Sequence, residues 1–239
     1  MAGHSKWANI KHRKARQDAK KGKIFTVLIK AITVAAKQGG ANPEDNSRLR
    51  LAIDKALAEN MTRDTINRAI ARGAGSNEAD NVEELTYEGY APGGVAVVVE
   101  VMTDNRNRTA ADVRHAFTKY GGNLGTTGSA SYLFNRQGSL HFTADNVDEI
   151  IELAMELDVE DFEQDDTGVS ITTDPAKFLN VYQELQDKGF KPDHAEIEMS
   201  PTTVVDLDES GIEKLNKLID ALEDLDDVSS VVTNANCES

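Results

Sequence analysis

The sequence predicts an α+β protein with an N-terminal three-helix domain and two split-βαβ (ferredoxin-like) domains, one nested in the other. Three observations lead to this class. Apolar residues recur at helical spacing three times between residues 24 and 73. Residues 95–102 are almost all apolar and β-branched, as in a strand buried on both faces. Beyond them, helix and strand patterns alternate to the C-terminus.

The three helical segments near the N-terminus have recognisable ends. Residues 24–32 begin the first segment, and Gly39-Gly40 ends it. Residues 49–57 form the second. Thr62 is the predicted N-cap of the third, which Gly73 closes. Because the loops between these amphipathic segments are short, we expect a small antiparallel bundle.

A helix follows the apolar strand, and Thr109 with Asp112 forms a variant capping box for it. Glycine-rich stretches lie at 87–94 and 121–128, and we expect both to be turns. The alternative is that they are loops that let an RNA or protein backbone approach closely. Neither stretch is a P-loop or a dinucleotide-binding GxGxxG. Residues 130–134 predict the next strand.

The remaining patterns complete two modules. We expect, in order, a strand at 139–142, a helix over 150–157, a hairpin at 165–168, a helix opened by Asp174 and Pro175, a strand at 195–199, a short strand at 204–205, a helix capped by Ser210, and a strand at 228–232. This order fits a βαββαβ module inserted into a second module, although two modules in series are the alternative. With nesting, the domains are 1–76, 77–135 plus 201–239, and 136–200.

The net charge of −15 conceals a strong asymmetry. Residues 1–80 contain 16 Lys and Arg against 8 Asp and Glu, whereas residues 81–239 contain 10 against 33. A basic head on an acidic body indicates a polyanionic partner for the head. The alternative is that the two parts neutralise each other across a domain interface.

The first 23 residues are a basic arm, with eight Lys and Arg and a single acidic residue. Lys and Arg at this density suit phosphate backbones, and Trp7 is available for stacking on a base. The alternative is a solvated tail without a partner. The predicted nucleic-acid contacts in the arm are Lys6, Trp7, Lys11, His12, Arg13, Lys14, Arg16, Lys20, Lys21 and Lys23.

A second basic island covers residues 106–136. Arg106 and Arg108 lie beside a predicted helix N-terminus, where backbone N–H groups also favour anions. Arginine suits bidentate contact with phosphate, so both residues are predicted nucleic-acid contacts. The alternative is that these arginines pair with the acidic tail of the same chain.

Several classes of function are excluded or disfavoured. The five histidines form no HxxxH or HExxH spacing, and the single Cys237 allows neither a disulfide within the chain nor a CxxC zinc site. No apolar stretch approaches ~18 residues, and no secretory signal opens the chain. We therefore expect a cytoplasmic protein that is not an enzyme, with no catalytic residues, metal, cofactor, small-molecule substrate or membrane partner.

Five stretches of the chain closely resemble the YebC family. They are MAGHSKWANIKHRKARQDAKKGKIFT, RLRLAIDKALAENM, YEGYAPGGVAVVVE, TDNRNRTAADVRHAFTKYGGNLG and LIDALEDLDDVSSVVTN. The resemblance implies a non-enzymatic protein of three domains, with a helical N-terminal domain and two α/β domains, and supports the nesting. It carries over as contacts Lys6, Trp7, Lys11, His12, Arg13, Lys14 and Arg16 in the arm, with Arg106 and Arg108.

Two functions are consistent with these features. The family is usually described as DNA-binding transcriptional regulators, and this is the first expectation. The alternative is a ribosome-associated translation factor that binds rRNA, since other members act at the ribosome and the family is credited with relieving stalling at proline runs. Against DNA, no helix-turn-helix pattern with a clear recognition helix stands out in the sequence. Lys and Arg meet the same phosphate in DNA and RNA, so charge does not separate the two.

Overall fold

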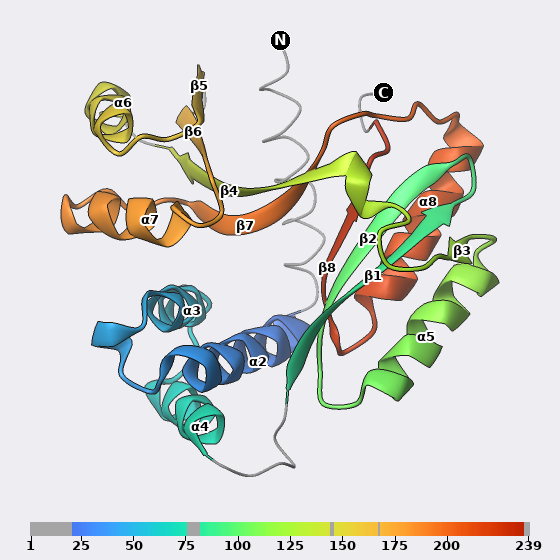
Figure 1. Ribbon diagram of the computed structural model, residues 1–239, viewed down its shortest axis with the longest axis horizontal. Helices are drawn as coiled ribbons and strands as arrows, with labels where there is room; N and C mark the ends of the chain where they lie inside the picture. Colours follow the sequence, from blue (N-terminus) through green and yellow to red (C-terminus); the bar gives the residue numbers. More distant parts are fainter. Residues whose placement is uncertain (1–20, 76–81, 144–145, 167, 237–239) are drawn as a thin grey trace. The chain divides into compact units, whose positions relative to one another are not determined.

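The computed structural model describes residues 21–75, 82–143, 146–166 and 168–236 (Figure 1). The chain forms two compact units. One comprises the described residues up to Phe134 together with Pro201–Asn236, and the other comprises Asn135–Ser200. Each unit is described by itself below.

The first unit begins with a three-helix bundle. Its helices are α2 (Lys21–Gly39), α3 (Ser47–Ala58) and α4 (Arg63–Ala74), with a short 3₁₀ turn, η1 (Pro43–Asp45), before α3. The Thr62 side chain accepts a hydrogen bond from the Thr65 N–H, which confirms the predicted N-cap. A β-carbon at Gly73 would collide with the Thr33 carbonyl, so this glycine allows α4 to pack closely against α2. The buried core of the bundle consists of Leu28, Ile32, Ala35, Ala36, Leu49, Ala52, Ala56, Met61, Ile66 and Ala69.

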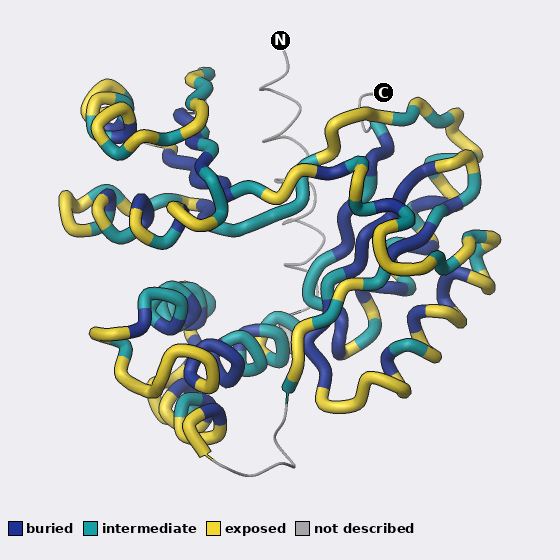
Figure 2. The backbone as a smooth tube through the Cα atoms, in the orientation of Figure 1, coloured by how far each residue is buried: buried dark blue, intermediate teal, exposed yellow. Residues whose placement is uncertain are grey.

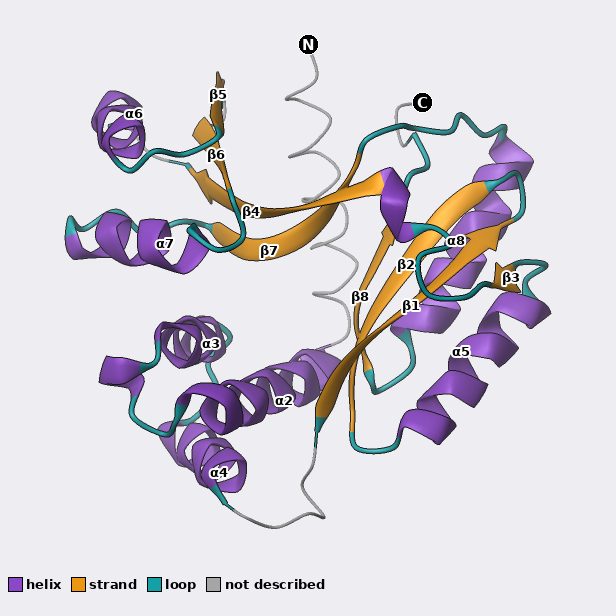
Figure 3. Cartoon of the chain, viewed as in Figure 1, coloured by secondary structure: helices purple, strands orange, loops and turns teal. Residues whose placement is uncertain are grey.

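The same unit contains an antiparallel sheet with strand order β3-β1-β2-β8. Its strands are β1 (Glu83–Ala91), β2 (Val95–Thr103), β3 (Asn123–Leu124) and β8 (Val228–Thr233). Helices α5 (Arg106–Lys119) and α8 (Glu209–Glu223) cover one face of this sheet (Figure 3). The residues of β2 are all buried except Glu100, as the apolar run predicts (Figure 2).

The core between this sheet and its helices explains why β2 is so apolar. Val97 and Val99 are fully buried on the face that meets Phe117 and Leu218. Side chains alternate between the two faces of a strand, so these two valines share one face. At about 25 cal/mol for each Å² of apolar surface removed from water, such burial is the main stabilising contribution in this unit.

The second unit has a four-stranded sheet of order β5-β6-β4-β7 with two helices. The elements are β4 (Phe134–Phe142), α6 (Val147–Glu156), β5 (Asp161–Asp165), β6 (Gly168–Thr173), α7 (Phe178–Asp187) and β7 (His194–Pro201). In chain order, β4 to β7 fall between β3 and α8. The α+β class and the nesting of one module within the other are therefore confirmed. The domain boundaries at residues 76, 135 and 200 stay a prediction.

His141 on β4 is buried, with 1% of its surface exposed, and its Nδ1 lies 2.9 Å from the Ser170 hydroxyl. Burial lowers its pKa, as does His194, while Asp165 and Asp193 oppose the shift. A histidine whose folded pKa is lowered stabilises the protein fully above its unfolded pKa of about 6.5, and less as the pH falls below it.

We therefore predict that the free energy of unfolding falls between pH 7.5 and 5.5, by at most about 1.4 kcal/mol per pH unit for this one proton. Urea unfolding at several pH values measures it. The His141→Gln variant, which cannot titrate in this range, should show a flatter pH dependence than the wild type. Parallel curves for the two proteins would contradict the assignment.

Two predicted strands are wrong. Residues 131–133 form the 3₁₀ turn η3 (Ser131–Leu133), and β4 begins only at Phe134. The Ala130 and Ser131 N–H groups donate to the Glu88 carboxylate, so they are not available to a strand ladder. Val204-Val205 is not a strand either, because Val205 makes only an isolated bridge with Ala235. The stretch predicted as a turn at 87–94 is instead largely strand, because residues 83–91 form β1.

Three helix starts also differ from expectation. Asn105, not Thr109, caps α5: its side chain accepts from the Arg108 N–H, and Thr109 is buried in the first turn. Asp208, not Ser210, caps α8 in the same way. The turn that Asp174 opens is not yet helical, and α7 begins at Phe178. Before α5 and α8 several polar residues stand close together in the sequence, so the local pattern does not by itself select the capping residue. Among the described helices, none combines the length and apolarity needed to cross a membrane.

Candidate nucleic-acid interface

Most of the predicted contacts fall outside the part of the chain that the structure describes. These are Lys6, Trp7, Lys11, His12, Arg13, Lys14, Arg16 and Lys20. Lys21 is the first residue of α2, and only its backbone is described. The structure therefore places the side chains of three predicted residues: Lys23, Arg106 and Arg108. These contacts stay predictions.

Arg108 is engaged by carboxylates of its own chain. Its Nη2 lies 2.9 Å from Asp104 Oδ1 and 3.0 Å from Asp227 Oδ2. These contacts raise the pKa of Arg108, the hydrogen bond to Asp227 most strongly. Asp227 belongs to the acidic C-terminal part, so pairing of this arginine with the acidic tail, the alternative that the sequence leaves open, is present in the structure.

Asp227 is the centre of a buried polar cluster, and its side chain is only 10% exposed. Its carboxylate accepts from Lys30 Nζ at 2.6 Å, from the Thr109 hydroxyl at 2.6 Å and from the Thr103 hydroxyl at 3.1 Å, besides Arg108. Burial by itself would raise the pKa of Asp227, but the hydrogen bonds from Lys30, Thr109 and Arg108 outweigh it and hold the pKa at about 2.

Lys23 and Lys30 on α2 bind the turn that follows α8. Lys23 Nζ donates to the Glu223 carbonyl, and Lys30 Nζ donates to the Asp226 carbonyl at 3.0 Å. The last carbonyls of a helix lack partners within it and carry the negative end of its dipole, so ammonium groups are favoured there. Lys23 and Arg108, far apart in the sequence, therefore meet at the same turn, residues 223–227.

Arg106 is different, because it is exposed and makes no ion pair with any described residue. Arg114, eight residues further along α5, is also exposed and free of ion pairs within the described chain. The Tyr87 hydroxyl donates to the Arg106 carbonyl at 3.3 Å. Burial raises the pKa of Tyr87, and Glu83 and Asp227 add to this shift, whereas the positive charges of Arg106 and Arg114 oppose it. Arg106, Arg114 and Tyr87 are called the α5 patch below.

The α5 patch has the chemistry of a phosphate site. No acidic residue lies in the first turn of α5, and the helix N-terminus adds partial positive charge there. Two unpaired guanidinium groups can each hold a phosphate through two N–H donors. Sequence reasoning found Arg106 but missed Tyr87, Lys30 and Asp227. Tyr87 lies in a stretch that we expected to be a turn, and Asp227 is one of many acidic residues near the C-terminus.

The bundle contains a helix pair that the sequence did not suggest as a binding motif. Helices α3 and α4 are joined by four residues, 59–62, and Asn60 takes the left-handed conformation with φ 62°. Connections of this length join the two helices of helix-turn-helix motifs. On α4, Arg63, Asn67 and Arg68 are exposed.

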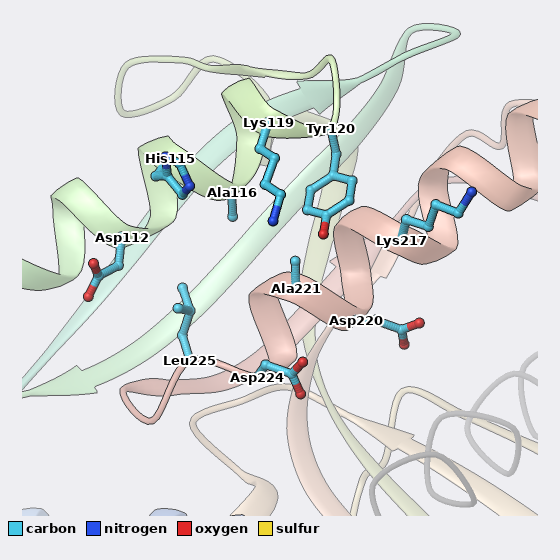
Figure 4. Close-up of a pocket in the computed structure, with 10 residues that line it drawn as sticks. All are labelled: Asp112, His115, Ala116, Lys119, Tyr120, Lys217, Asp220, Ala221, Asp224 and Leu225. Carbon is cyan, nitrogen blue, oxygen red and sulfur yellow. The ribbon is translucent and has the colours of Figure 1, made fainter.

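A groove of about 490 Å³ lies between α5 and α8 (Figure 4). It is lined by Asp112, His115, Ala116, Lys119, Tyr120, Lys217, Asp220, Ala221, Asp224 and Leu225, and none of these is a predicted contact. Its three carboxylates outnumber its two lysines, so the groove has no positive charge that would select a polyanion. For this reason we place the candidate interface at the α5 patch.

The ligating atoms of His194, Glu196 and Glu198 on β7 lie within 4.8 Å of one another. This is the group of described residues that could hold a metal ion. Each of the three side chains also takes part in other interactions, so we assign no metal to it. The expectation that the protein needs no metal stays a prediction.

A solved structure and curated proteins resemble this chain throughout its length. The crystal structure of a conserved hypothetical protein, Aq1575, from Aquifex aeolicus matches with a TM-score of 0.82 and 46% identity, over 92% of this chain and 91% of that one. A probable transcriptional regulatory protein of Pseudomonas putida is 63% identical over 98% of this chain and 96% of its own length. The transcriptional regulatory protein PmpR of Pseudomonas aeruginosa is 62% identical over the same shares.

These names indicate a regulatory protein rather than an enzyme. Two family models also match and together cover most of the sequence. Residues 5–76 match the N-terminal domain of the TACO1/YebC protein, and residues 82–235 match the second and third domains of TACO1/YebC. The chain therefore belongs to the TACO1/YebC family.

Proposed function

We propose that the protein is a non-enzymatic, nucleic-acid-binding regulator of gene expression that acts in the cytoplasm as a DNA-binding transcriptional regulator. The observation that carries this proposal is the α5 patch, where Arg106 and Arg114 are exposed without ion pairs to described residues and the Arg106 carbonyl accepts from the Tyr87 hydroxyl. In a chain of net charge −15, two arginines left unneutralised on one helix, one of them at its N-terminus, favour a phosphate partner. The names of the relatives support the transcriptional role.

The α3–α4 pair supports duplex DNA as the target. The second helix of a helix-turn-helix pair enters the major groove and reads bases with its N-terminal residues. Arginine pairs with guanine and asparagine with adenine in that groove. Arg63, Asn67 and Arg68 are exposed on α4. Arg68 Nη2 lies 3.0 Å from Asp64 Oδ2 and donates to the Thr65 hydroxyl at 3.4 Å, both on the same helix.

The alternative is a ribosome-associated translation factor that binds rRNA and relieves stalling at proline runs. The uncharged loop 125–131 favours it, because RNA is recognised largely through close approach to unpaired nucleotides and stacking on their bases. Both functions use the same contact with phosphate, so the first test concerns that contact.

The test is a titration of the full chain with fluorescently labelled duplex DNA at several salt concentrations. For the double variant Arg106→Ala/Arg114→Ala we expect weaker binding to every sequence. We also expect a slope of log K against log salt that is smaller by about two, since each phosphate contact contributes about 0.9. The matched control, Lys188→Ala/Lys214→Ala, removes the same charge from exposed positions elsewhere and should keep the wild-type slope. Equal slopes for all three proteins would contradict the proposal.

A further inference from the structure

One end of the first sheet carries a surface without charged side chains. Three segments form it: residues 89–95, 120–134 and 201–205, none of which contains Asp, Glu, Lys or Arg. Hydrogen bonds join them. The Tyr90 hydroxyl donates to the Ser129 carbonyl at 2.7 Å, and the Thr202 N–H donates to the Leu133 carbonyl at 2.9 Å. We call these segments the neutral rim.

The neutral rim stands out against the charge around it. Residues 81–239 carry 33 Asp and Glu against 10 Lys and Arg, so most of this region repels a phosphate backbone. The rim does not. It also exposes the hydroxyl residues Thr126 and Thr127, and Gly128 has a φ of +83° with open space where a side chain would stand. A polynucleotide backbone can therefore come close to this loop without meeting an acidic side chain of the rim's own segments or a side chain at Gly128.

A buried carboxylate fixes the loop of the rim. Glu88 on β1 is 4% exposed, and its two oxygens accept from the N–H groups of Gly128, Ala130 and Ser131 at 2.9, 2.8 and 2.7 Å. The Gly125 N–H adds a bond to the Glu88 carbonyl at 2.8 Å. A surface loop with so many internal bonds keeps one conformation, which reduces the entropy lost on binding.

Tyr132 is held beside this loop with its ring exposed. Tyr132 is 70% exposed, and it follows directly on the residues whose N–H groups Glu88 holds. Interaction with Tyr132 is the largest cause of the raised pKa of Tyr90, whose own hydroxyl donates to the Ser129 carbonyl. The ring of Tyr132 therefore extends from a fixed stretch of backbone while most of its surface meets solvent. Among the large apolar residues of the rim, only Val204 shares this exposure, at 60%.

We propose that Tyr132 is a stacking residue for an unpaired base of a single-stranded nucleic acid whose backbone passes along Thr126–Gly128. This inference rests on the nucleic-acid binding that the proposed function and its translational alternative share, and it adds a second contact to the α5 patch. An exposed aromatic ring next to a loop of hydroxyl residues and glycine suits base stacking, which needs only a flat π surface. A polypeptide partner would call for an apolar groove around the ring, and the rim offers few exposed apolar neighbours.

The experiment uses the full chain and a short single-stranded RNA that contains one 2-aminopurine, a base whose fluorescence is quenched by stacking. For Tyr132→Ala we expect the affinity for this RNA to fall by up to about tenfold. We also expect the quenching of the 2-aminopurine fluorescence to be lost. Tyr132→Phe keeps the aromatic ring, so it should keep most of the affinity for the RNA and most of the quenching. The control Met155→Ala removes an apolar side chain of the other unit that is 60% exposed, against 70% for Tyr132. This control should change neither the affinity nor the quenching. Because Tyr132 is exposed, its truncation leaves the core intact.

The outcomes separate this inference from the proposed function. If Tyr132→Ala binds and quenches as the wild type does, while Arg106→Ala/Arg114→Ala weakens binding, the stacking role is overturned and the proposed function stands. If the wild type binds neither single-stranded RNA nor duplex DNA, both are overturned. If Tyr132→Ala changes the binding of an uncharged peptide but not of RNA, the rim is a polypeptide site and the proposal is again overturned.

Discussion

Replacing Asp227 with alanine should lower the free energy of unfolding by about 3–5 kcal/mol, because it leaves buried partners without their acceptor. The carboxylate holds Lys30 of the bundle and Arg108 of α5 together with the Thr103 and Thr109 hydroxyls, and its side chain is 10% exposed. Urea unfolding followed by circular dichroism measures the change. The neighbouring Asp226→Ala removes the same charge from an exposed side chain, so it should cost less than about 0.5 kcal/mol.

The same carboxylate makes a specific prediction for acid. Its pKa is lowered to about 2 in the folded protein, against about 3.9 for an unfolded aspartate. A group with a lowered folded pKa stabilises the protein above its unfolded pKa, and the contribution disappears as the pH falls through the folded value. About 2.5 kcal/mol should therefore be lost progressively between about pH 5 and pH 1, with most of the loss between pH 4 and pH 2. An Asp227→Asn variant that loses as much stability as the wild type over this range would contradict the assignment.

Replacing Glu88 with alanine should destabilise the first unit by about 2–4 kcal/mol and release the loop 125–131. Three N–H groups, those of Gly128, Ala130 and Ser131, would lose their acceptor. Burial opposes ionisation of Glu88, yet these three donors lower its pKa, so the charged form belongs to the folded state. The contribution is therefore present at neutral pH and lost in acid.

Amide hydrogen exchange measures the effect of Glu88→Ala where it should be largest. We expect the protection of residues 128, 130 and 131 to fall, while amides in the core of β2 exchange only as fast as the lower global stability requires. Glu83→Ala, on an exposed side chain of the same strand, should leave the loop protected. Unchanged exchange in the loop of Glu88→Ala would show that other contacts fix it.

The two carboxylates also show where sequence reasoning ends. The periodicity and the apolar composition of the sequence predict the α+β class and the buried strand β2. Local capping chemistry predicts Thr62 as the N-cap of α4. Glu88 and Asp227 cannot be distinguished from exposed acids by any local pattern, since their partners lie 40 and 118 or more residues away. Glu88 also affects the local structure, because the N–H groups of residues 130 and 131 donate to its carboxylate and are not available to the predicted strand.

The candidate site divides in the same way. The sequence predicts a helix N-terminus flanked by arginines, and in the structure Arg106 is the exposed first residue of α5. Whether an arginine is free depends on which acids the fold brings to it, and only the structure shows that Asp227 occupies Arg108. Arg114, which is also exposed and without an ion pair to a described residue, lies eight residues beyond Arg106, a little over two helical turns further along α5. The arm, from Lys6 to Lys20, lies outside the described residues and stays a prediction.

The most direct test of nucleic-acid binding is sedimentation of a gently lysed extract through a sucrose gradient, with the chain followed by antibody and with nuclease-treated controls. We expect the chain in a heavy fraction from which a nuclease releases it. DNase sensitivity corresponds to the transcriptional role, and RNase sensitivity with ribosomal particles corresponds to the translational alternative. A chain that stays at the top of every gradient, with or without nuclease, would contradict the proposed function.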